Sequence, residues 1–283
     1  MPRLRRSDTS AAGLRLPRGR GFQCLTAAGS RPDAADMDRI RQLVIPPAWT
    51  DVWICPHASG HLQATGIDAA GRRQYLYHAE WRARRDREKH DHVLAIAASL
   101  PAAREVAGTQ LAGRGLSRER VLAAAFTLLD VGLFRIRGDR YAEENGSYGL
   151  MTLQRDHVHC TQDGLVFEYP AKSGKERMLV VAAAPVRTVI CTLRRKRPPD
   201  RRLLAHRDRG GWRELDSGDM NSYLRELFGQ EVSAKDLRTW HATVLAAVGL
   251  AVSGHAATSP GIRPGWPATQ GGFEAAVIRL LND

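Results

Sequence analysis

Three short basic segments carry residue types that can hold a phosphate. Arg135 stands in an apolar stretch, Lys172 and Lys175 flank a Ser-Gly pair, and Arg238 lies two residues after Asp236. A guanidinium stays ionised and can donate two hydrogen bonds to anionic oxygens, whereas a lysine supplies a compact point charge. Each segment also has a purely structural interpretation. Arg135 could be a buried ion-pair partner, Arg238 could pair locally with Asp236, and the lysine segment could be an exposed hairpin end.

The charge balance favours a polyanionic partner. The 283 residues include 42 Lys and Arg against 30 Asp and Glu, a formal net charge of +12. Such an excess attracts nucleic acid, where binding gains from the release of counterions. The alternative is a coding bias toward arginine that leaves a merely solvated basic surface. We therefore expect a nucleic-acid partner, to be tested against the motifs.

The four cysteines, Cys24, Cys55, Cys160 and Cys191, are scattered and form no Cys-x-x-Cys pair. This spacing argues against a zinc site and against a disulfide framework, and it suits a reducing cytosol. The basic N-terminus lacks the apolar run of about 7–15 residues that a secretory signal needs. No apolar run of about 18 residues is present, so we expect no membrane span.

The local composition and spacing of apolar residues divide the chain into a β-rich part and a mostly helical part. Residues 1–20 are rich in Arg, Ser, Gly and Pro and predict a basic flexible arm. Short apolar stretches separated by turn residues follow to about Tyr77, as in a small β-sheet. Later segments have helical composition, with Ser117 as a candidate N-cap and Pro101 opening a further helix. Gln162-Asp163-Gly164 predicts a hairpin between flanking strands. The expected fold is α+β in two lobes.

Four segments in this order resemble the type IB DNA topoisomerases in their compact, poxvirus-like bacterial form. They read IPPAW with GRRQYLYH at 45–49 and 71–78, LFRI through YAEENGSYGL at 133–150, AKSGKE at 171–176, and KDLRTW at 235–240. The resemblance covers roughly residues 20–259. It implies a small β-sheet domain at 21–85 joined to a helical catalytic domain at 86–259, forming a C-shaped clamp around duplex DNA, with a divergent tail at 260–283.

The resemblance also implies roles for individual residues. Arg135 and Arg238 match the arginines that stabilise the extra negative charge of the pentacoordinate phosphorane. Lys172 matches the lysine that protonates the leaving 5′-oxygen, with Lys175 as the second choice. The DNA contacts implied are Gln74, Tyr75, Tyr77, Tyr141 and Lys175. Neither a metal nor another cofactor is expected, and the implied partner is double-stranded DNA bound by a monomer in the bacterial cytoplasm, at the nucleoid.

The sequence departs from the family at the nucleophile. The family attacks the phosphate with a tyrosine near the C-terminus, after a segment reading roughly Gly-Asn-Thr-Pro or Gly-His-Thr-Pro. The last of the six tyrosines here is Tyr223, so none follows Arg238. His255 is a candidate for the family's other catalytic group, the His or Asn before Thr-Pro. Alternative alignments place Trp266, Pro267 or Phe273 at the position of the nucleophile.

The residues after Ser259 switch to Pro, Gly and Ala, a composition that does not suit the basic helix of the family. We interpret this segment as the product of a shifted reading frame or a degenerate gene. The sequence thus predicts a topoisomerase-like protein that binds duplex DNA and is deficient in cleavage. The alternatives are a non-catalytic DNA-binding protein on the same scaffold and a tyrosine recombinase relative, against which the Gln-Tyr-Leu-Tyr motif argues.

Overall fold

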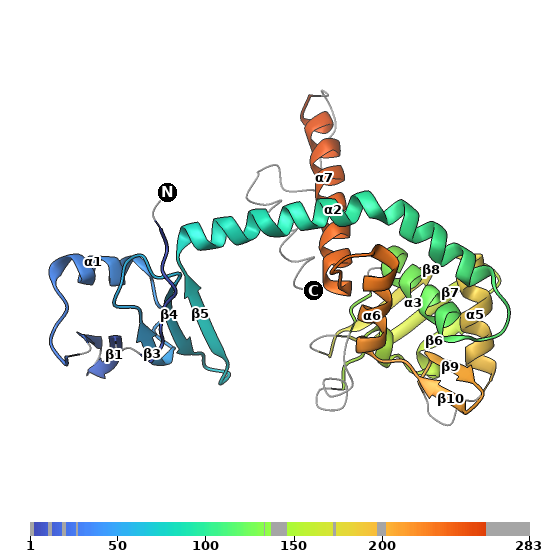
Figure 1. The fold of residues 1–283 in the computed structure, drawn as a ribbon, viewed down its shortest axis with the longest axis horizontal. Helices are drawn as coiled ribbons and strands as arrows, with labels where there is room; N and C mark the ends of the chain where they lie inside the picture. The colour runs from blue at the N-terminus through green and yellow to red at the C-terminus, as the bar shows by residue number, and fades with distance from the viewer. Residues whose placement is uncertain are drawn as a thin grey trace. The chain divides into compact units, whose positions relative to one another are not determined.

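The computed structural model describes residues 3–10, 13–18, 21–26, 28–132, 134–136, 146–171, 174–196 and 202–258. The chain forms two compact units, Met1–Asp91 and His92–Asp283, so the division falls six residues after the expected one. Helix α2, Ala79–Ala112, begins in the first unit and continues into the second. The mixed α+β architecture expected from the sequence is confirmed (Figure 1).

Unit 1 is an antiparallel five-stranded sheet with one helix on one face. The strand order is β2-β1-β3-β4-β5, and the strands are β1 Gly13–Arg18, β2 Gly21–Thr26, β3 Thr50–Ile54, β4 Leu62–Ile67 and β5 Arg73–Tyr77. Helix α1, Ala34–Gln42, starts at Asp33, whose carboxylate accepts from the amide of Asp36. Its apolar residues Met37 and Ile40 pack against buried Val52, Ile54 and Ala64, which forms the core of this unit.

The flexible arm expected over residues 1–20 is wrong for part of its length. Strand β1 pairs with both β2 and β3, so it lies inside the sheet. Farther upstream, the Ser7 hydroxyl donates to the Leu62 carbonyl at 2.8 Å and accepts from the Leu62 amide at 3.1 Å. The Arg, Gly and Pro content obscured the alternation of Leu14 and Leu16 with other residues, which is the strand period.

Unit 2 is built around a buried helix, α3, Arg118–Gly132. Every residue from Val121 to Phe126 is buried, and the helix contacts α5, α6, α7, β8 and β9. The surrounding helices are α5 Ala184–Arg195, α6 Ser217–Phe228 and α7 Ala234–Thr258. Two 3-10 turns, Leu150–Thr152 and Arg155–His157, precede the strands. As predicted, Ser117 caps α3, its hydroxyl accepting from the Arg120 amide at 3.4 Å.

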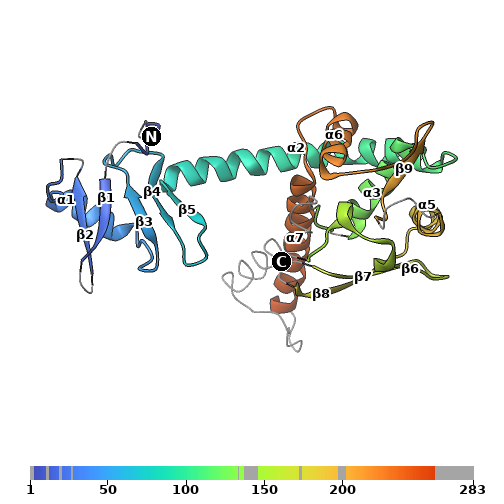
Figure 2. The same cartoon turned by 90° about the horizontal axis from the view of Figure 1, so that it is seen from below.

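Two small sheets complete the described part of unit 2. The first has the order β6-β7-β8, with β6 Val158–Cys160, β7 Leu165–Pro170 and β8 Glu176–Val181, and the second pairs β9 Ala205–Asp208 with β10 Gly211–Glu214. The predicted hairpin around Gln162-Asp163-Gly164 is confirmed as the β6–β7 connection. Figure 2 shows the β6-β7-β8 sheet with α5 along its β6 side. The largely apolar residues 177–193 divide between β8 and α5.

Helix α2 continues through Pro101, where the sequence predicted a new start. A proline inside a helix removes one backbone hydrogen bond and normally kinks or ends it. Here Ile96, Leu100, Ala103 and Ala107 are buried at intervals of three or four residues on both sides of the proline. This continuous apolar stripe offsets the lost hydrogen bond. Among the described residues, no helix combines the length and apolar character required to cross a membrane.

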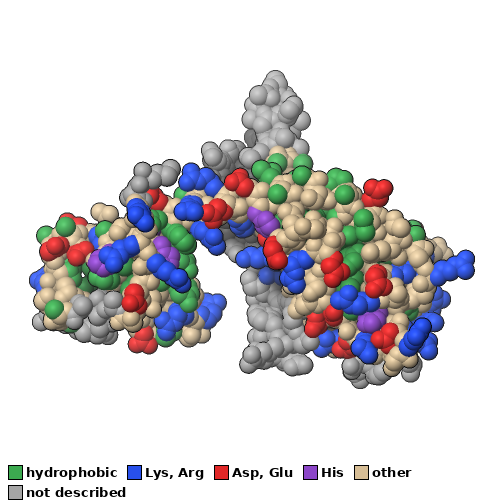
Figure 3. Space-filling view, in the orientation of Figure 1, with side chains coloured by type: hydrophobic (Ala, Val, Ile, Leu, Met, Phe, Trp, Pro, Cys, Tyr) green, Lys and Arg blue, Asp and Glu red, His purple; other side chains and the backbone are tan. Residues whose placement is uncertain are grey.

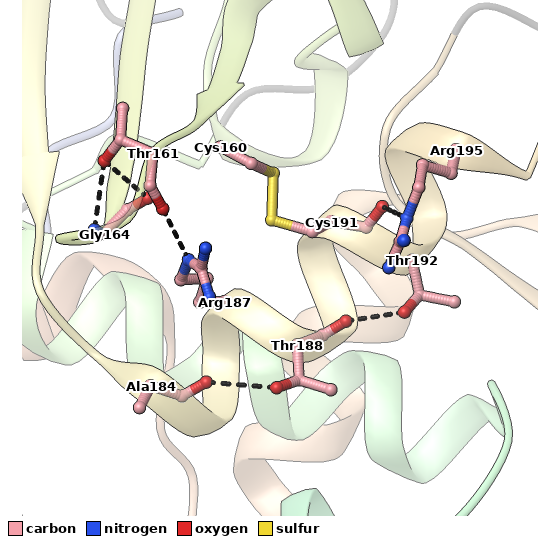
Figure 4. Close-up of a disulfide and its surroundings, with 9 residues drawn as sticks. All are labelled: Cys160, Thr161, Gly164, Ala184, Arg187, Thr188, Cys191, Thr192 and Arg195. Carbon is pink, nitrogen blue, oxygen red and sulfur yellow. Dashed lines mark hydrogen bonds between the residues drawn. A yellow bond between two sulfur atoms is a disulfide. The ribbon is translucent and has the colours of Figure 1, made fainter.

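The cysteine spacing argued against a disulfide framework, but Cys160 and Cys191 form a disulfide bond (Figure 4). Their Cα atoms lie 6.1 Å apart, although the two residues are 31 positions apart in sequence. Packing of α5 against β6 creates this proximity, which no local motif could reveal. Cys24 and Cys55 are buried and take no part in a disulfide. The bond closes a loop that contains the whole β7–β8 hairpin.

We expect Cys160→Ser to lower the free energy of unfolding by about 3–4 kcal/mol under non-reducing conditions, because closing a loop of this length restricts the unfolded chain. Urea unfolding with and without a thiol reductant measures the effect. Reductant should bring the parent protein down to the level of the variant and leave the variant unchanged. Cys24→Ala should keep the full reductant dependence. A parent protein whose unfolding midpoint ignores the reductant contradicts this prediction.

Candidate functional site

Arg135 is positioned by the packing of the residue before it. Phe134 is 1% exposed and packs edge-on against Phe167 and parallel to Tyr169, with ring centroids 5.0 and 6.2 Å away. Both partners lie on β7, so the segment after α3 is fixed against this strand. The Arg135 carbonyl accepts from the Leu150 amide at 2.8 Å. The side chain of Arg135 is half-buried, so a charge is held at the edge of the core.

The turn that contains Lys172 lies at the end of the same strand. The Ala171 amide donates to the Lys175 carbonyl at 2.8 Å, and Gly174 takes a left-handed φ of 70° that suits glycine. Lys172 lies outside the described residues, whereas Lys175 is exposed. The Tyr148 amide donates to the Pro170 carbonyl at 2.8 Å. Since Leu150 binds Arg135, the segment around Tyr148 links Arg135 to the lysine turn.

Arg238 reaches this region from α7. Its side chain is half-buried, and its pKa is lowered first by burial and then by the charge of Arg177. Arg177 lies on β8, opposite Tyr169 in the register, and two residues after Lys175. Two arginines therefore repel one another beside the turn, and a bound anion would offset that repulsion. Sequence reasoning did not single out Arg177, because only the folded chain brings β8 near Arg238 on α7.

Asp236, the local partner that the sequence suggested for Arg238, binds Ser233. Its carboxylate accepts from the Ser233 amide at 3.0 Å and from the Ser233 hydroxyl at 2.6 Å. It thereby stabilises the first turn of α7, where an acidic residue is favoured by the helix dipole. His92 lies 3.8 Å from the same carboxylate. The position of Asp236 is thus explained without an ion pair to Arg238.

A buried carboxylate connects α3, which ends shortly before Arg135, with α7, which carries Arg238. Asp130, on α3, lies five residues before Arg135, and His241 lies one turn after Arg238 on α7. Arg104 on α2 donates twice to Asp130, at 2.8 and 3.1 Å, and His241 Nε2 lies 3.2 Å from the same carboxylate. The side chain of Asp130 is only 7% exposed. Nothing in the local sequence pattern distinguishes Asp130, because its partners come from distant helices.

His157 lies next to Tyr148, near the end of β7. The two rings meet edge-on with centroids 4.4 Å apart, and His157 Nδ1 accepts from the Gln154 amide at 3.1 Å. Burial lowers the pKa of His157, although the charges of Asp156 and Glu176 act in the opposite direction. This imidazole is therefore biased toward its neutral form. It stiffens the segment that joins Arg135 to the lysine turn.

In unit 1, Tyr75 and Tyr77 lie on the same face of β5, as their spacing predicted. They are 47% and 40% exposed, and their rings stack with centroids 6.2 Å apart. Gln74 lies on the opposite face, where its amide donates to Asp68 at 2.8 Å. Backbone and side-chain hydrogen bonds from Arg72 lower the pKa of Asp68 to about 2. The structure thus separates Gln74 from the two tyrosines with which the resemblance grouped it.

Besides Lys172, two of the expected site residues cannot be placed. Tyr141 lies outside the described residues, and His255 belongs to α7 but its side chain is not among those described. The basic run of α2, Arg82, Arg84, Arg85, Arg87 and Lys89, is exposed, and Figure 3 shows Lys and Arg side chains gathered along this helix. Arg84 and Arg85 both bind Glu88 at 2.9 Å. Within the described part of the chain, no group of three or more His, Cys, Asp or Glu side chains could hold a metal.

We expect Asp130→Asn to lower the free energy of unfolding at pH 7 by roughly 2–3 kcal/mol, because it removes the charge that binds Arg104 and His241. Burial raises the pKa of Asp130, but hydrogen bonds from His241 and Arg104 together with their charges lower it overall, below 3.8. A depressed folded-state pKa means that this stability is present above about pH 4 and is lost as the pH falls through the folded-state value.

Urea unfolding of both proteins between pH 3 and 7 tests this prediction. The difference between them should shrink as the pH falls below about 4. Asp163→Asn, at an exposed carboxylate in the β6–β7 turn, is the control and should leave the profile unchanged. Parallel profiles for the parent protein and Asp130→Asn would show that the carboxylate does not stabilise the fold through its charge.

Comparison with known proteins covers both units. Residues 21–68 match the family model of the bacterial DNA topoisomerase IB N-terminal domain, and residues 78–260 match that of the eukaryotic DNA topoisomerase I catalytic core. A relative named DNA topoisomerase 1B, from Acanthamoeba polyphaga mimivirus, is 26% identical over 212 residues. The match covers 74% of this chain and 63% of the relative, so the chain spans less than two thirds of the relative's length.

These matches agree with the architecture and with the convergence of cationic residues in unit 2. The first family model ends just before β5, and the second begins at the start of α2 and extends through Arg238. The match therefore includes α3, the β6-β7-β8 sheet and α7, the elements that carry the candidate phosphate site. The chain belongs to the type IB DNA topoisomerase family.

Proposed function

We propose that this chain binds duplex DNA and holds a backbone phosphate between Arg135, the turn containing Lys172, and Arg238. The observation that carries the proposal is that Arg238, half-buried on α7, lies close enough to Arg177 on β8 for burial and then this charge to lower its pKa. A half-buried cation beside another cation is stabilised by an anion between them. A phosphodiester supplies that anion, and the planar guanidinium can donate two hydrogen bonds to it.

The same groups suit the chemistry of the family. Attack on a phosphodiester builds negative charge on the non-bridging oxygens, and fixed cationic donors stabilise that charge. In this proposal Arg135 and Arg238 contact those oxygens. Lys172 protonates the leaving 5′-oxygen, and Lys175 is the alternative donor. The cations nearby would lower the pKa of a lysine at this turn, which favours proton transfer near neutral pH.

Unit 1 supplies the second contact with DNA in this proposal. Tyr75 and Tyr77 present stacked, exposed rings on β5, and their hydroxyls can donate to phosphate oxygens. In this proposal Tyr141 and Lys175 add contacts with the DNA backbone near the scissile phosphate. Gln74 can contact a base edge only if it gives up its hydrogen bond to Asp68, so we assign it a smaller part in DNA binding.

We further propose that the 283-residue chain does not cleave DNA. The family's covalent step needs a tyrosine hydroxyl, and the last tyrosine here, Tyr223, precedes Arg238. Tyr223 is 3% exposed, its hydroxyl donates to Gln110 at 2.7 Å, and burial raises its pKa. A buried, protonated phenol is unsuited to attack a phosphate. Without the nucleophile this reaction path is lost, whereas the residues proposed to bind the phosphate remain.

Duplex binding tests the phosphate site. We expect Arg177→Gln and Arg238→Gln each to weaken binding to duplexes of unrelated sequence by similar factors. Each should also reduce the slope of log affinity against log salt by about 1, because one phosphate contact is lost. Fluorescence anisotropy with labelled duplexes between 50 and 200 mM salt, about the range in which such contacts are resolved, is the measurement.

Arg225→Gln is the matched control, since it removes the same charge from an exposed position on α6. It should leave the salt slope nearly unchanged. If the three variants behave alike, the arginines contribute only to the overall charge, and the proposed phosphate site does not exist.

A relaxation assay tests the lack of cleavage. We expect the purified 283-residue chain to leave supercoiled plasmid unrelaxed without ATP and to form no covalent adduct with DNA. The same sample must bind duplex DNA, so that inactivity cannot come from misfolding. An active type IB topoisomerase serves as the positive control. Relaxation that increases with the amount of protein would overturn this proposal, and mapping the adduct would identify the nucleophile.

A further inference from the structure

The Cys160–Cys191 disulfide lines an open pocket of about 320 Å³ in unit 2. The other lining residues are Arg187, Thr188, Arg194 and Arg195, so among the residues that the structure describes the lining includes three cations and no carboxylate. Figure 4 shows the sulfur bridge between the side chains of Arg187 and Arg195. A disulfide in this setting is both accessible and surrounded by positive charge.

The arginines are held beside the bridge by backbone carbonyls. Arg187 Nε donates to the Thr161 carbonyl at 2.7 Å, which lies next to Cys160 in sequence. Arg195 Nε donates to the carbonyl of Cys191 itself at 3.3 Å. Each guanidinium uses one donor for its anchor, and the charge therefore stays close to the sulfur atoms. Arg194 is exposed and adds a third positive charge to the lining.

Such surroundings favour thiol–disulfide exchange with an anionic partner. A thiolate next to arginine is stabilised, and a thiol of lower pKa is the better leaving group. Positive charge around a pocket also raises the local concentration of an anion and the rate at which it arrives. The two effects act on the same reaction, one on the leaving sulfur and the other on the incoming molecule.

We propose that the Cys160–Cys191 bridge is an exchange site for a small thiol that carries carboxylates. The incoming thiol loses its proton to solvent, and its sulfur forms a bond to one Sγ of the bridge. The Cys160–Cys191 bond breaks, and its electron pair leaves on the other Sγ as a thiolate. The product is a mixed disulfide whose carboxylates lie among Arg187, Arg194 and Arg195. The step needs no oxidant beyond the bridge itself.

The packing of α5 lets the fold survive this exchange. Val186, Val189, Ile190 and Leu193 are all at most 1% exposed and anchor α5 in the main core of unit 2. The helix therefore stays in place when the bridge opens. What changes is the covalent closure of the loop between Cys160 and Cys191, which includes β7, β8 and the turn with Lys172. Exchange at the pocket thereby acts on the hairpin without unfolding the unit.

The experiment compares thiols of opposite charge on the folded 283-residue protein in the absence of DNA. Reduced glutathione is the anionic probe, and cysteamine is the cationic probe. Rate constants for opening the bridge are normalised to equal thiolate concentration, and peptide mapping by mass spectrometry locates the mixed disulfide. We expect glutathione to be attached at Cys160 or Cys191. The ratio of the glutathione to the cysteamine rate constant should fall about tenfold in Arg194→Gln/Arg195→Gln.

Arg82→Gln/Arg87→Gln is the matched control, because it removes the same net charge from exposed positions on α2. It should leave the ratio unchanged, whereas added salt should lower the ratio in the parent protein. The proposal is overturned if both double variants change the ratio equally, or if attachment requires denaturant. It is also overturned if glutathione is found only at Cys24 or Cys55. None of these outcomes depends on DNA binding, so the proposed function is tested separately.

Discussion

The cationic site of unit 2 requires like charges to be held close together against their repulsion. Burial and then the charge of Arg177 lower the pKa of Arg238, and the lysine turn adds further positive charge nearby. Freely moving side chains would separate to relieve this repulsion. Packing elsewhere in the fold must therefore offset the free-energy cost of holding them together. Helix α3 and the strands behind it supply that packing. Phe134, Phe167 and Tyr169 fix the segment of Arg135, and hydrophobic burial of this kind is the largest favourable contribution to folding.

Asp130 complements this scaffold from the inside. Its carboxylate is the negative charge that connects α2, α3 and α7 through Arg104 and His241. The two arginines proposed to bind phosphate lie close in sequence to these contacts. Arg135 follows the end of α3, and Arg238 lies one turn before His241 on α7. Asp130 thus joins the helices through Arg104 and His241, which are not among the residues of the proposed phosphate site. That arrangement suits a site whose ligand must be able to leave, because the helices remain joined without it.

The elements that sequence reasoning predicted are those determined by neighbouring residues. The Gln162-Asp163-Gly164 turn, the Ser117 cap and the alternation that places Tyr75 beside Tyr77 all depend on spacings of a few positions. Strand β1 was missed because its Arg and Gly content looked like a flexible arm, although sheet partners satisfy its backbone. Helix α2 passes through Pro101 because buried residues on both sides hold it. Cys160–Cys191, Arg177 and Asp130 were missed because each depends on elements that only the folded chain brings together.

The disulfide and the lysine turn lie at opposite ends of the same strands. Cys160 is next to the β6–β7 turn, whereas Ala171 follows the last residue of β7, a six-residue strand about 17 Å long. At that distance in salt, the charge of a group at the bridge is screened from the phosphate site. Any influence of the bridge on the turn must therefore be mechanical, through the register of β7 with β8. Because Arg177 lies in that register opposite Tyr169, the same ladder that transmits the restraint also positions one of the site's cations.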